Sequence, residues 1–502
     1  MEPLAGPDGP PLRRGPASPT LHWPGKPTPE QVLAEARQIQ PRFRLAERWG
    51  APEVEAGQLY WGENLHVAAH LLQAWRGRVD LVYIDPPFGL QRALRRRWGA
   101  HPADPVAYQD RWPEGLAGYL QMLYPRLVLI RELLSDSGSL YVHLGPQVAP
   151  YVRVLLDELF GPGTFRNEII WRRDAAGKGG KRASPQWPRN TESILFYTKR
   201  PKGYHFTQLT RPLSPEQAAA YRLKEPDGRR FRAVQLGNYT EASIRRLEAQ
   251  GRIYVSPTGK RYKKYYLDEA RATIDGLWTD LPGFGTRSAA KEHLGYPGQK
   301  PEALLERILL ASSRPGDVVA DLFAGTGTTL VVAQRLGRRW LGCDLSPLAL
   351  QACRRRLSAL DGAALEIWWE EAPAPCGVEG ERAPVGVEAR REGRAVRLRL
   401  VGLPQGPGAP AGGPGDGPPL VEGWAVDGEM AGVFRPLWHT FGPVRVQDPP
   451  LAREAVVPLP VQAQGVRVQV ADGAGRLYRF AARLGELPAG PGWAALVQVA
   501  HD

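Results

Sequence analysis

One segment whose residue types could do chemistry is a glycine-rich turn. Residues 321–329 read Asp-Leu-Phe-Ala-Gly-Thr-Gly-Thr-Thr and stand at the predicted end of a strand and start of a helix. Glycines there let the backbone approach a ligand closely, and a helix N-terminus favours negative charge. Asp344 ends the next predicted strand, where a carboxylate can bind both hydroxyls of a ribose. The segment therefore predicts a site for an adenosine ligand.

The spacing of the glycines narrows the ligand further. The third glycine of a dinucleotide-binding turn would fall on Leu330, which argues against NAD and for a shorter nucleoside. The alternative interpretation is a tight strand–helix turn that any α/β protein can contain.

A second segment, Asp85-Pro86-Pro87-Phe88, follows the apolar run at 79–84. Two consecutive prolines donate no backbone hydrogen bonds and keep the chain stiff. The Asp85 carboxylate and the Pro86 carbonyl are then acceptors, and Phe88 offers a flat face. Such a set suits a planar ring that carries an exocyclic NH2 group. The alternative is an ordinary turn, because this composition is common in turns.

Strands and helices alternate around both segments, which indicates an α/β sheet. The apolar run at 79–84 is typical of a buried parallel strand. Thr28 and Pro29 predict a helix start. We expect further helices from after Asn64 to Trp75, at 114–134, at 301–313 and from after Asp344 to about 360. Further strands are expected at 58–61, 139–144, 168–171, 193–197, 318–323 and 340–344.

Changes in composition and apolar pattern along the sequence predict five parts. Residues 1–28 form an irregular, Pro-rich tail, and 200–276 is a basic, aromatic, turn-rich segment between two α/β stretches at 29–199 and 277–362. Short alternating apolar runs after 362 indicate a β-rich C-terminal domain at 363–502, interrupted by a Pro/Gly loop at 403–419. Only one helix follows Asp344 before that domain. We therefore expect the next strand of the sheet to come from 59–61.

Positive charge is concentrated in one part of the chain. The 502 residues carry 65 Lys plus Arg against 52 Asp plus Glu, a net charge of +13, whereas residues 166–300 alone carry +14. A localised basic segment indicates a polyanion partner, most often a nucleic acid. A generic solvated surface is the alternative, although it would not localise the excess.

Cysteine usage and hydropathy exclude several classes of protein. Three cysteines without a CxxC spacing exclude a disulfide scaffold and a cysteine zinc cluster, and we expect no metal site. The N-terminus does not resemble a signal peptide, and no uncharged apolar run reaches 18 residues. We expect a soluble protein of a reducing, cytoplasmic compartment.

Together the two motifs resemble those of S-adenosylmethionine-dependent DNA methyltransferases that act on adenine N6 or cytosine N4. The order, with Asp-Pro-Pro-Phe before the glycine turn, resembles the permuted β group of that family, found in type III modification subunits and solitary methylases. Flanking segments over about 20–360 are also similar. These are Trp23–Lys26, Gly62–Asn64, Tyr266–Glu269, Trp278–Asp280 and Gly295–Pro301, with Glu63 in place of the more usual Asp and Gly298 in place of the more usual Thr.

The resemblance implies a circularly permuted Rossmann-like sheet with 200–276 as an inserted target-recognition segment. It also implies S-adenosylmethionine as cofactor and a base flipped out of the duplex. An initial Asp in the catalytic motif is usual for adenine and Ser for cytosine, so Asp85 favours adenine N6. The implied catalytic residues are Asp85, Pro86, Pro87 and Phe88. The implied cofactor-binding residues are Asp321, Phe323, Ala324, Gly325, Gly327, Thr328, Asp344 and, near the methionine end, Lys300.

Double-stranded DNA is the expected partner, and basic residues between the two motifs are the predicted contacts. These are Lys178, Lys181, Arg182, Lys260, Arg261, Lys263 and Lys264. Residues 177–181 are glycine- and lysine-rich but lack the Gly and Ser/Thr that a phosphate-binding P-loop needs at 175 and 182. Two further partners are possible from the sequence: a second copy of this chain in a homodimer, and a restriction enzyme on a separate chain.

Three other functions are compatible with parts of this pattern. Cytosine N4 methylation uses the same machinery. Methylation of RNA or of a protein glutamine also needs a pocket for a planar NH2 group, but relatives of that kind usually have Asn-Pro-Pro-Tyr and the unpermuted order. A DNA-binding protein with a vestigial pocket is the non-enzymatic alternative, although both half-sites are intact.

Overall fold

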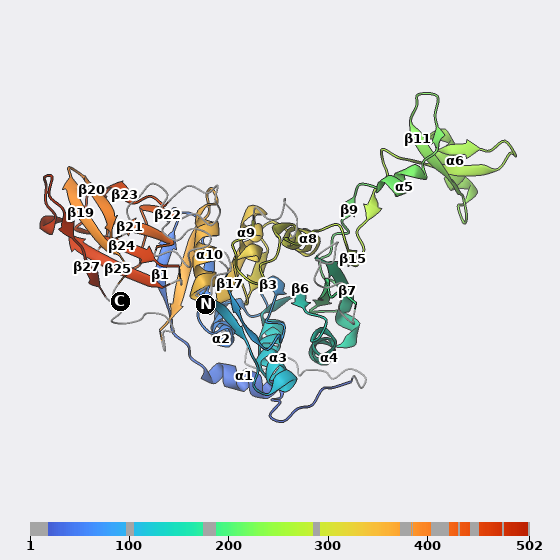
Figure 1. The fold of residues 1–502 in the computed structure, drawn as a ribbon. Helices are drawn as coiled ribbons and strands as arrows, with labels where there is room; N and C mark the ends of the chain where they lie inside the picture. The colour runs from blue at the N-terminus through green and yellow to red at the C-terminus, as the bar shows by residue number, and fades with distance from the viewer. Residues whose placement is uncertain are drawn as a thin grey trace, which may run out of the picture. The chain divides into compact units, whose positions relative to one another are not determined.

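A ten-stranded mixed sheet forms the centre of the protein (Figure 1). The computed structural model describes residues 19–96, 105–173, 187–284, 292–371, 383, 385–402, 421–429, 432–441, 451–473 and 476–499. In spatial order the strands of this sheet are β1 (Phe43–Trp49), β18 (Leu365–Glu370), β2 (Gly57–Trp61), β17 (Arg339–Asp344), β16 (Val318–Asp321), β3 (Val79–Ile84), β6 (Leu134–Leu144), β8 (Thr191–Thr198), β7 (Phe165–Arg172) and β15 (Leu277–Trp278).

The central strands of this sheet come from opposite ends of the sequence. β16 pairs in parallel with β3 and with β17, and β17 pairs in parallel with β2. Asp344 lies opposite Trp61, so the strand beyond Asp344 does come from the N-terminal part, as the sequence predicts. The sheet also continues past residue 362, because β18 pairs with β2 and β1 instead of joining the C-terminal domain.

Helices cover the sheet in two groups (Figure 1). One group packs together as α1 (Pro29–Gln38), α2 (Asn64–Trp75), α3 (Gly115–Leu133) and α4 (Ala149–Phe160). The other consists of α8 (Glu302–Ser312), α9 (Thr328–Arg335) and α10 (Pro347–Ser358). The predicted cap of the first helix is present, since Thr28 and Gln31 form a reciprocal capping box.

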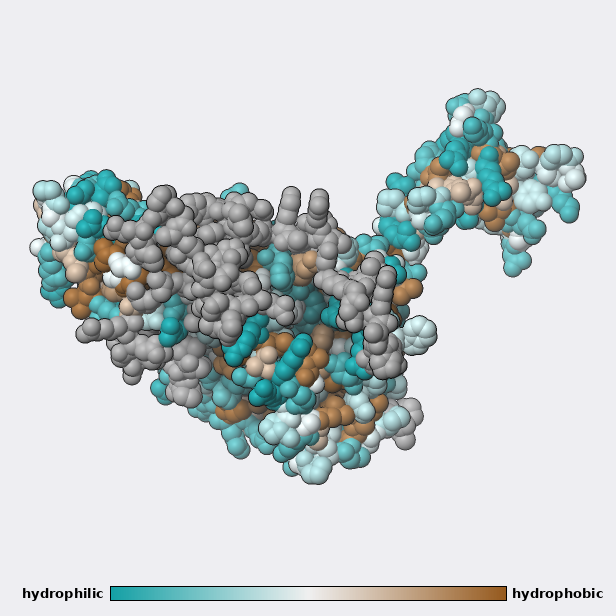
Figure 2. All heavy atoms as spheres, in the orientation of Figure 1, coloured by the Kyte–Doolittle hydropathy of each residue, from teal (hydrophilic) through white to brown (hydrophobic). Residues whose placement is uncertain are grey.

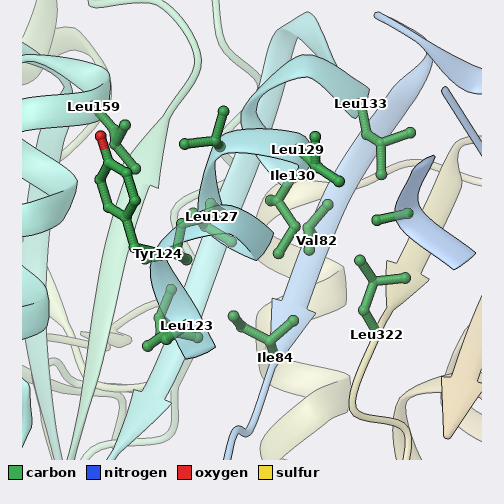
Figure 3. Packing of buried hydrophobic residues seen from close by; sticks show 14 of the residues in the cluster. Val82, Ile84, Leu123, Tyr124, Leu127, Leu129, Ile130, Leu133, Leu159 and Leu322 are labelled. Atoms are coloured by element: carbon green, nitrogen blue, oxygen red, sulfur yellow. The ribbon is translucent and has the colours of Figure 1, made fainter. Parts of the chain in front are cut away.

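The main core lies between β3 and the helices around α3 (Figure 3). Val82 and Ile84 project from β3 toward Leu127 and Ile130 of α3, and all four are fully buried. Asp80 is the polar exception in β3, and its carboxylate accepts bonds from the Val318 amide at 3.0 Å and the Ser135 hydroxyl at 3.0 Å. The exception therefore ties β3 to its neighbours β16 and β6.

The C-terminal part contains two antiparallel sheets that share one apolar core. Phe434 from this part forms backbone hydrogen bonds with the outer edge of β1, donating to Ala46 at 2.9 Å and accepting from Arg48 at 2.8 Å. Residues of the loop predicted at 403–419 lie outside the described residues. The two sheets contain β23 (Glu454–Pro458), β20 (Ala395–Val401), β19 (Gly386–Glu392) and β26 (Ala494–Ala495), and β22 (Trp438–Phe441), β21 (Gly423–Asp427), β24 (Gly465–Ala471), β25 (Leu477–Arg483) and β27 (Val497–Val499).

The chain divides into two compact units, one of Met1–Phe206 with Leu277–Asp502 and a smaller one of Thr207–Gly276, here called unit 2. Unit 2 carries a sequence net charge of +6 and a mostly hydrophilic surface (Figure 2). Its elements are β9 (Thr210–Arg211), α5 (Pro215–Ala219), β10 (Leu223–Lys224), β11 (Arg230–Gln235), α6 (Glu241–Ala249), β12 (Ile253–Val255), β13 (Arg261–Tyr266) and β14 (Ala272–Thr273).

Candidate active site

The carboxyl ends of β3, β16 and β17 meet at a cavity of about 500 Å³. Ligands of open α/β sheets bind at this end of the strands. Nine of the predicted site residues line the cavity: Asp85, Pro87, Lys300, Asp321, Phe323, Ala324, Gly325, Thr328 and Asp344. Pro86, Phe88 and Gly327 adjoin them in sequence but are not among the lining residues. The two motifs, which begin 236 positions apart at Asp85 and Asp321, thus share one cavity.

Asp85 forms an ion pair with Lys300 inside this cavity. Lys300 Nζ lies 2.5 Å from Asp85 Oδ2, and the side chain of Lys300 is only 9% exposed. The same ammonium lies 5.1 Å from the centroid of the Phe88 ring. Lys300 therefore contacts the acid of the catalytic motif directly, in addition to the role near the cofactor that the sequence predicts.

Two further buried side chains extend this ion pair. Glu192 of β8 lies 3.8 Å from Lys300 Nζ and 2.8 Å from His143 Nε2, and His143 Nδ1 lies 2.8 Å from the Tyr83 hydroxyl. Burial alone would raise the pKa of Glu192, but Lys300, His143 and Arg173 together hold it at about 2. Glu192 therefore places a negative charge beside Lys300 and His143 at neutral pH.

The chain after Phe88 is held by hydrogen bonds from two sides. The Asp110 carboxylate accepts from the Gly89 amide at 2.9 Å and the Leu90 amide at 2.8 Å, while Gln147 donates to the Phe88 carbonyl at 2.9 Å. Gln91 has a φ of +57°, a backbone conformation that residues other than glycine rarely adopt. Surrounding bonds must therefore maintain this conformation.

Asp344 organises the glycine turn. Its Oδ2 accepts from the Gly325 amide at 2.8 Å and its Oδ1 from the Ser346 amide at 2.8 Å. Burial raises the pKa of Asp344, and these backbone bonds act in the opposite direction. The carboxylate thus joins the end of β17 to the turn that begins α9.

Asp321 is almost completely buried at the end of β16. Burial, with repulsion from Asp85 and Asp344, raises its pKa to about 7. Hydrogen bonds from the Thr329 hydroxyl at 2.6 Å and the Phe323 amide at 3.0 Å oppose that shift only in part. Near neutral pH this group therefore exists in both protonation states.

Glu63 and Gly298, which replace residues more usual in the family that the sequence resembles, both have defined surroundings. Glu63 caps α2, accepting from the Leu65 amide at 2.7 Å and the His66 amide at 3.3 Å, and lines the cavity. Gly298 has a φ of +80°, and a Cβ there would lie 3.1 Å from the Tyr108 hydroxyl oxygen. A side chain at position 298 would therefore be strained and crowded.

The predicted DNA contacts fall into three groups. Lys178, Lys181 and Arg182 lie outside the described residues. Arg261 and Lys264 in unit 2 are already paired with acids, the former with Glu241 and Glu248 and the latter with Glu225. Lys263 donates to the Tyr239 hydroxyl at 2.9 Å and lies 4.6 Å from the Tyr265 ring centroid, while Lys260 is exposed.

Several residues around the cavity were missed by the sequence reasoning. Tyr108 and Tyr296 line it with their rings 6.3 Å apart, and Asn64 and Arg126 line it near Glu63. His143 and Glu192 could have been suspected, because His143 interrupts the apolar run 140–144 and Glu192 stands two residues before the apolar run 194–197. Among the described residues, no group of three or more His, Cys, Asp or Glu side chains could hold a metal.

Comparison with known proteins identifies the family. The model of the DNA methylases with N6 or N4 specificity matches residues 79–354, more than half of the chain. The chain belongs to the N6/N4 DNA methylase family. This confirms the resemblance seen in the sequence, and the protein is an S-adenosylmethionine-dependent DNA methyltransferase.

Several known proteins are similar to this chain. The methylase is 29% identical to the type II methyltransferase M.EcaI of Enterobacter cloacae, over 68% of this chain and 77% of that protein. It is 25% identical to the DNA adenine methyltransferase YhdJ of Escherichia coli, over 56% of this chain and 76% of that protein. A solved DNA modification methylase of Thermus thermophilus, complexed with S-adenosylmethionine, is 22% identical over 63% and 99%, with a TM-score of 0.35.

The residues around the cavity fit this cofactor. A volume of about 500 Å³ is in the range of small-molecule pockets. Two of its acidic groups, Asp321 and Asp344, suit a ligand that combines a positive charge with hydroxyl donors. Within the described ranges, no helix of the methylase combines the length and apolar character needed to cross a membrane.

Proposed function

We propose that the methylase transfers a methyl group to the N6 atom of an adenine that has left the DNA duplex, at a specific sequence. The observation that carries this proposal is that Asp85 and the glycine turn line one cavity. Methyl transfer requires the group that accepts the base and the turn that binds the cofactor to line the same cavity. Asp344, Gly325, Asp321 and Phe323 would hold the cofactor, which when bound supplies an activated methyl group.

The amino group of the base would bind to Asp85 and to the Pro86 carbonyl, with Phe88 beside the ring. An aromatic amine is a poor nucleophile because its lone pair is delocalised into the ring. Two acceptors for its N–H bonds favour a pyramidal nitrogen whose lone pair is available. Lys300 orients the Asp85 carboxylate and stabilises its negative charge, so Asp85 acts as an acceptor first and takes up a proton only after positive charge develops on nitrogen.

We favour adenine over cytosine as the target base because the catalytic motif begins with Asp85. One relative, YhdJ of Escherichia coli, is named a DNA adenine methyltransferase, which agrees with this choice. Cytosine N4 is the alternative, since the same two acceptors could hold that amino group.

Unit 2 is our candidate for target recognition within the segment 200–276. Arg and Lys side chains contact phosphates and guanine edges, and tyrosines can stack on bases. Lys260 and Lys263 are better placed for phosphate than Arg261 and Lys264, whose charges are partly compensated by acids. A homodimer and a separate restriction enzyme stay predictions.

The strand order supports a circularly permuted sheet. The acceptor half at 29–199 and the cofactor half at 277–362 each supply strands to one sheet, and β2 completes the cofactor side from the N-terminal part. This connectivity is what a permuted methyltransferase sheet requires, with 200–276 inserted between the halves and 363–502 following as a C-terminal domain.

The decisive experiment is sequencing of modified bases in plasmid DNA incubated with the protein and S-adenosylmethionine. We expect N6-methyladenine at one recognition sequence. Asp85→Ala should abolish transfer and leave cofactor binding within about twofold, because the residue contacts the base rather than the turn. Asp136→Ala is a matched control at an exposed carboxylate of β6 and should remain active. Full activity of Asp85→Ala would refute the mechanism, and N4-methylcytosine would refute the choice of base.

A further inference from the structure

A buried ion pair joins the C-terminal domain to the neighbourhood of the catalytic motif. Arg96 donates two parallel hydrogen bonds to Glu422, at 3.0 and 2.7 Å, and the two side chains are 1% and 2% exposed. Bidentate pairing fixes orientation as well as distance. Removing either partner leaves an uncompensated charge in the interior.

Both ends of this pair are anchored in regular structure. Arg96 directly follows β4 (Arg92–Arg95), which forms a hairpin with β5 (Val106–Asp110), and its amide donates to the Pro105 carbonyl at 3.0 Å. Glu422 directly precedes β21, and its amide donates to the Ala471 carbonyl at 2.7 Å. The ion pair therefore connects a hairpin of the methylase half to a sheet of the C-terminal domain.

The hairpin in turn holds the catalytic loop, which we define as residues 85–90. Asp110, the last residue of β5, accepts from the amides of Gly89 and Leu90 and is fully buried. Tyr108 of the same strand lines the cavity, and Ala107 packs against Tyr296 and Leu348. Movement of the hairpin would therefore move both the catalytic loop and one wall of the cavity.

We propose that the C-terminal domain positions the catalytic loop through the Glu422–Arg96 pair, the β4–β5 hairpin and Asp110. Glu422 is then a positioning residue for methyl transfer, although it touches neither the base nor the cofactor. This inference rests on the proposed role of Asp85. It assigns a function to a domain that lies outside the residues matched by the family model.

A second buried contact between the same parts provides the control. Glu47 of β1 is fully buried, pairs with Arg354 at 2.8 Å and accepts from Gln469 of the C-terminal domain at 3.1 Å. It lies at the outer edge of the sheet, and these partners belong to α10 and β24 rather than to the hairpin. Glu47→Gln therefore weakens docking of the C-terminal domain at a contact that includes no residue of the hairpin or of the catalytic loop.

The test compares Glu422→Gln and Arg96→Lys with Glu47→Gln in the full-length protein. Arg96→Lys keeps the buried charge but loses the bidentate geometry, so it decides the question if Glu422→Gln does not fold. Hydrogen–deuterium exchange of the peptide spanning 85–95 reports on the loop without any methylation assay. Steady-state methylation of plasmid DNA gives kcat and KM. Wild-type protein and Asp85→Ala, measured alongside, show separately whether the proposed role of Asp85 holds.

We expect faster exchange in 85–95 and a fall in kcat of about tenfold to a hundredfold for both hairpin-linked variants, because small displacements of a reacting group cost that much. Glu47→Gln should lower the melting temperature and leave exchange in 85–95 and kcat within about twofold. Wild-type exchange and kcat in a folded Arg96→Lys or Glu422→Gln would overturn the proposal. An equal effect of Glu47→Gln would also overturn it, since the effect would then belong to docking in general.

Discussion

Replacing Asp321 by Asn should make the stability of the methylase less dependent on pH. The pKa of this buried carboxyl is raised to about 7 from the 3.8 that is ordinary for an aspartate. The folded state therefore binds a proton that the unfolded chain releases between these two values. Stability from this group is complete below about pH 4 and is lost as the pH rises toward 7. Asparagine keeps the size and an acceptor oxygen but cannot ionise.

The expected magnitude follows from the two pKa values. One pKa unit corresponds to about 1.4 kcal/mol, so the raised pKa of Asp321 lowers the free energy of unfolding by roughly 2 kcal/mol at pH 5 and roughly 4 kcal/mol at pH 8, relative to its value at low pH. The advantage of Asp321→Asn over wild type should accordingly grow by about 2–3 kcal/mol between pH 5 and pH 8. Urea unfolding followed by tryptophan fluorescence at several pH values measures this difference.

A second variant tests the cause of the shift. Thr329 donates a hydrogen bond to Asp321 that favours the ionised form. Thr329→Val should therefore raise the pKa of Asp321 further and move the loss of stability to higher pH. A difference between Asp321→Asn and wild type that stays constant from pH 5 to pH 8 would show that the folded-state pKa is not raised, and the reasoning would be wrong.

Three further predictions concern other parts of the protein. Gly327→Ala should lower the free energy of unfolding by about 1–3 kcal/mol more than Gly337→Ala in denaturant titrations, because both have a φ near +70° but only at 327 would a Cβ lie 2.8 Å from the sulfur of Cys353. Glu192→Gln should lower kcat and leave the calorimetric affinity for S-adenosylmethionine unchanged. A weaker affinity would show instead that Glu192 contributes to cofactor binding. Methylation should fall steeply with salt, and Lys263→Ala should reduce the salt slope by about one, whereas an unchanged slope would remove Lys263 from the DNA contacts.

The elements that the sequence predicted well are those whose signals are local. β3 is a short apolar run with a proline stop, and α1 begins with a complete capping box, so neighbours in sequence decide both. β1 and β18 were not expected in the central sheet, because their pairing joins residues more than 300 positions apart. No local pattern distinguishes β18 from the strands of the C-terminal domain.

The candidate site shows the same division. The two motifs could be recognised because each concentrates its chemistry in a few consecutive residues. The Lys300–Asp85 pair, the Glu192–His143 contact and the Asp110 bonds could not, because each depends on which strand ends meet in space. Lys300 was named for the cofactor, and its contact with the catalytic acid emerged only from the fold.

The backbone bonds between Phe434 and β1 have a consequence for how the chain behaves when it is shortened. Unpaired backbone groups at the edge of a sheet can pair with another molecule. Residues 46 and 48 of β1 use theirs to bind Phe434, so the C-terminal domain covers this edge. A chain that ends before residue 434 would expose that edge and self-associate with rising concentration. Light scattering must therefore accompany any activity measurement on a truncated protein, since aggregation alone could silence an intact active site.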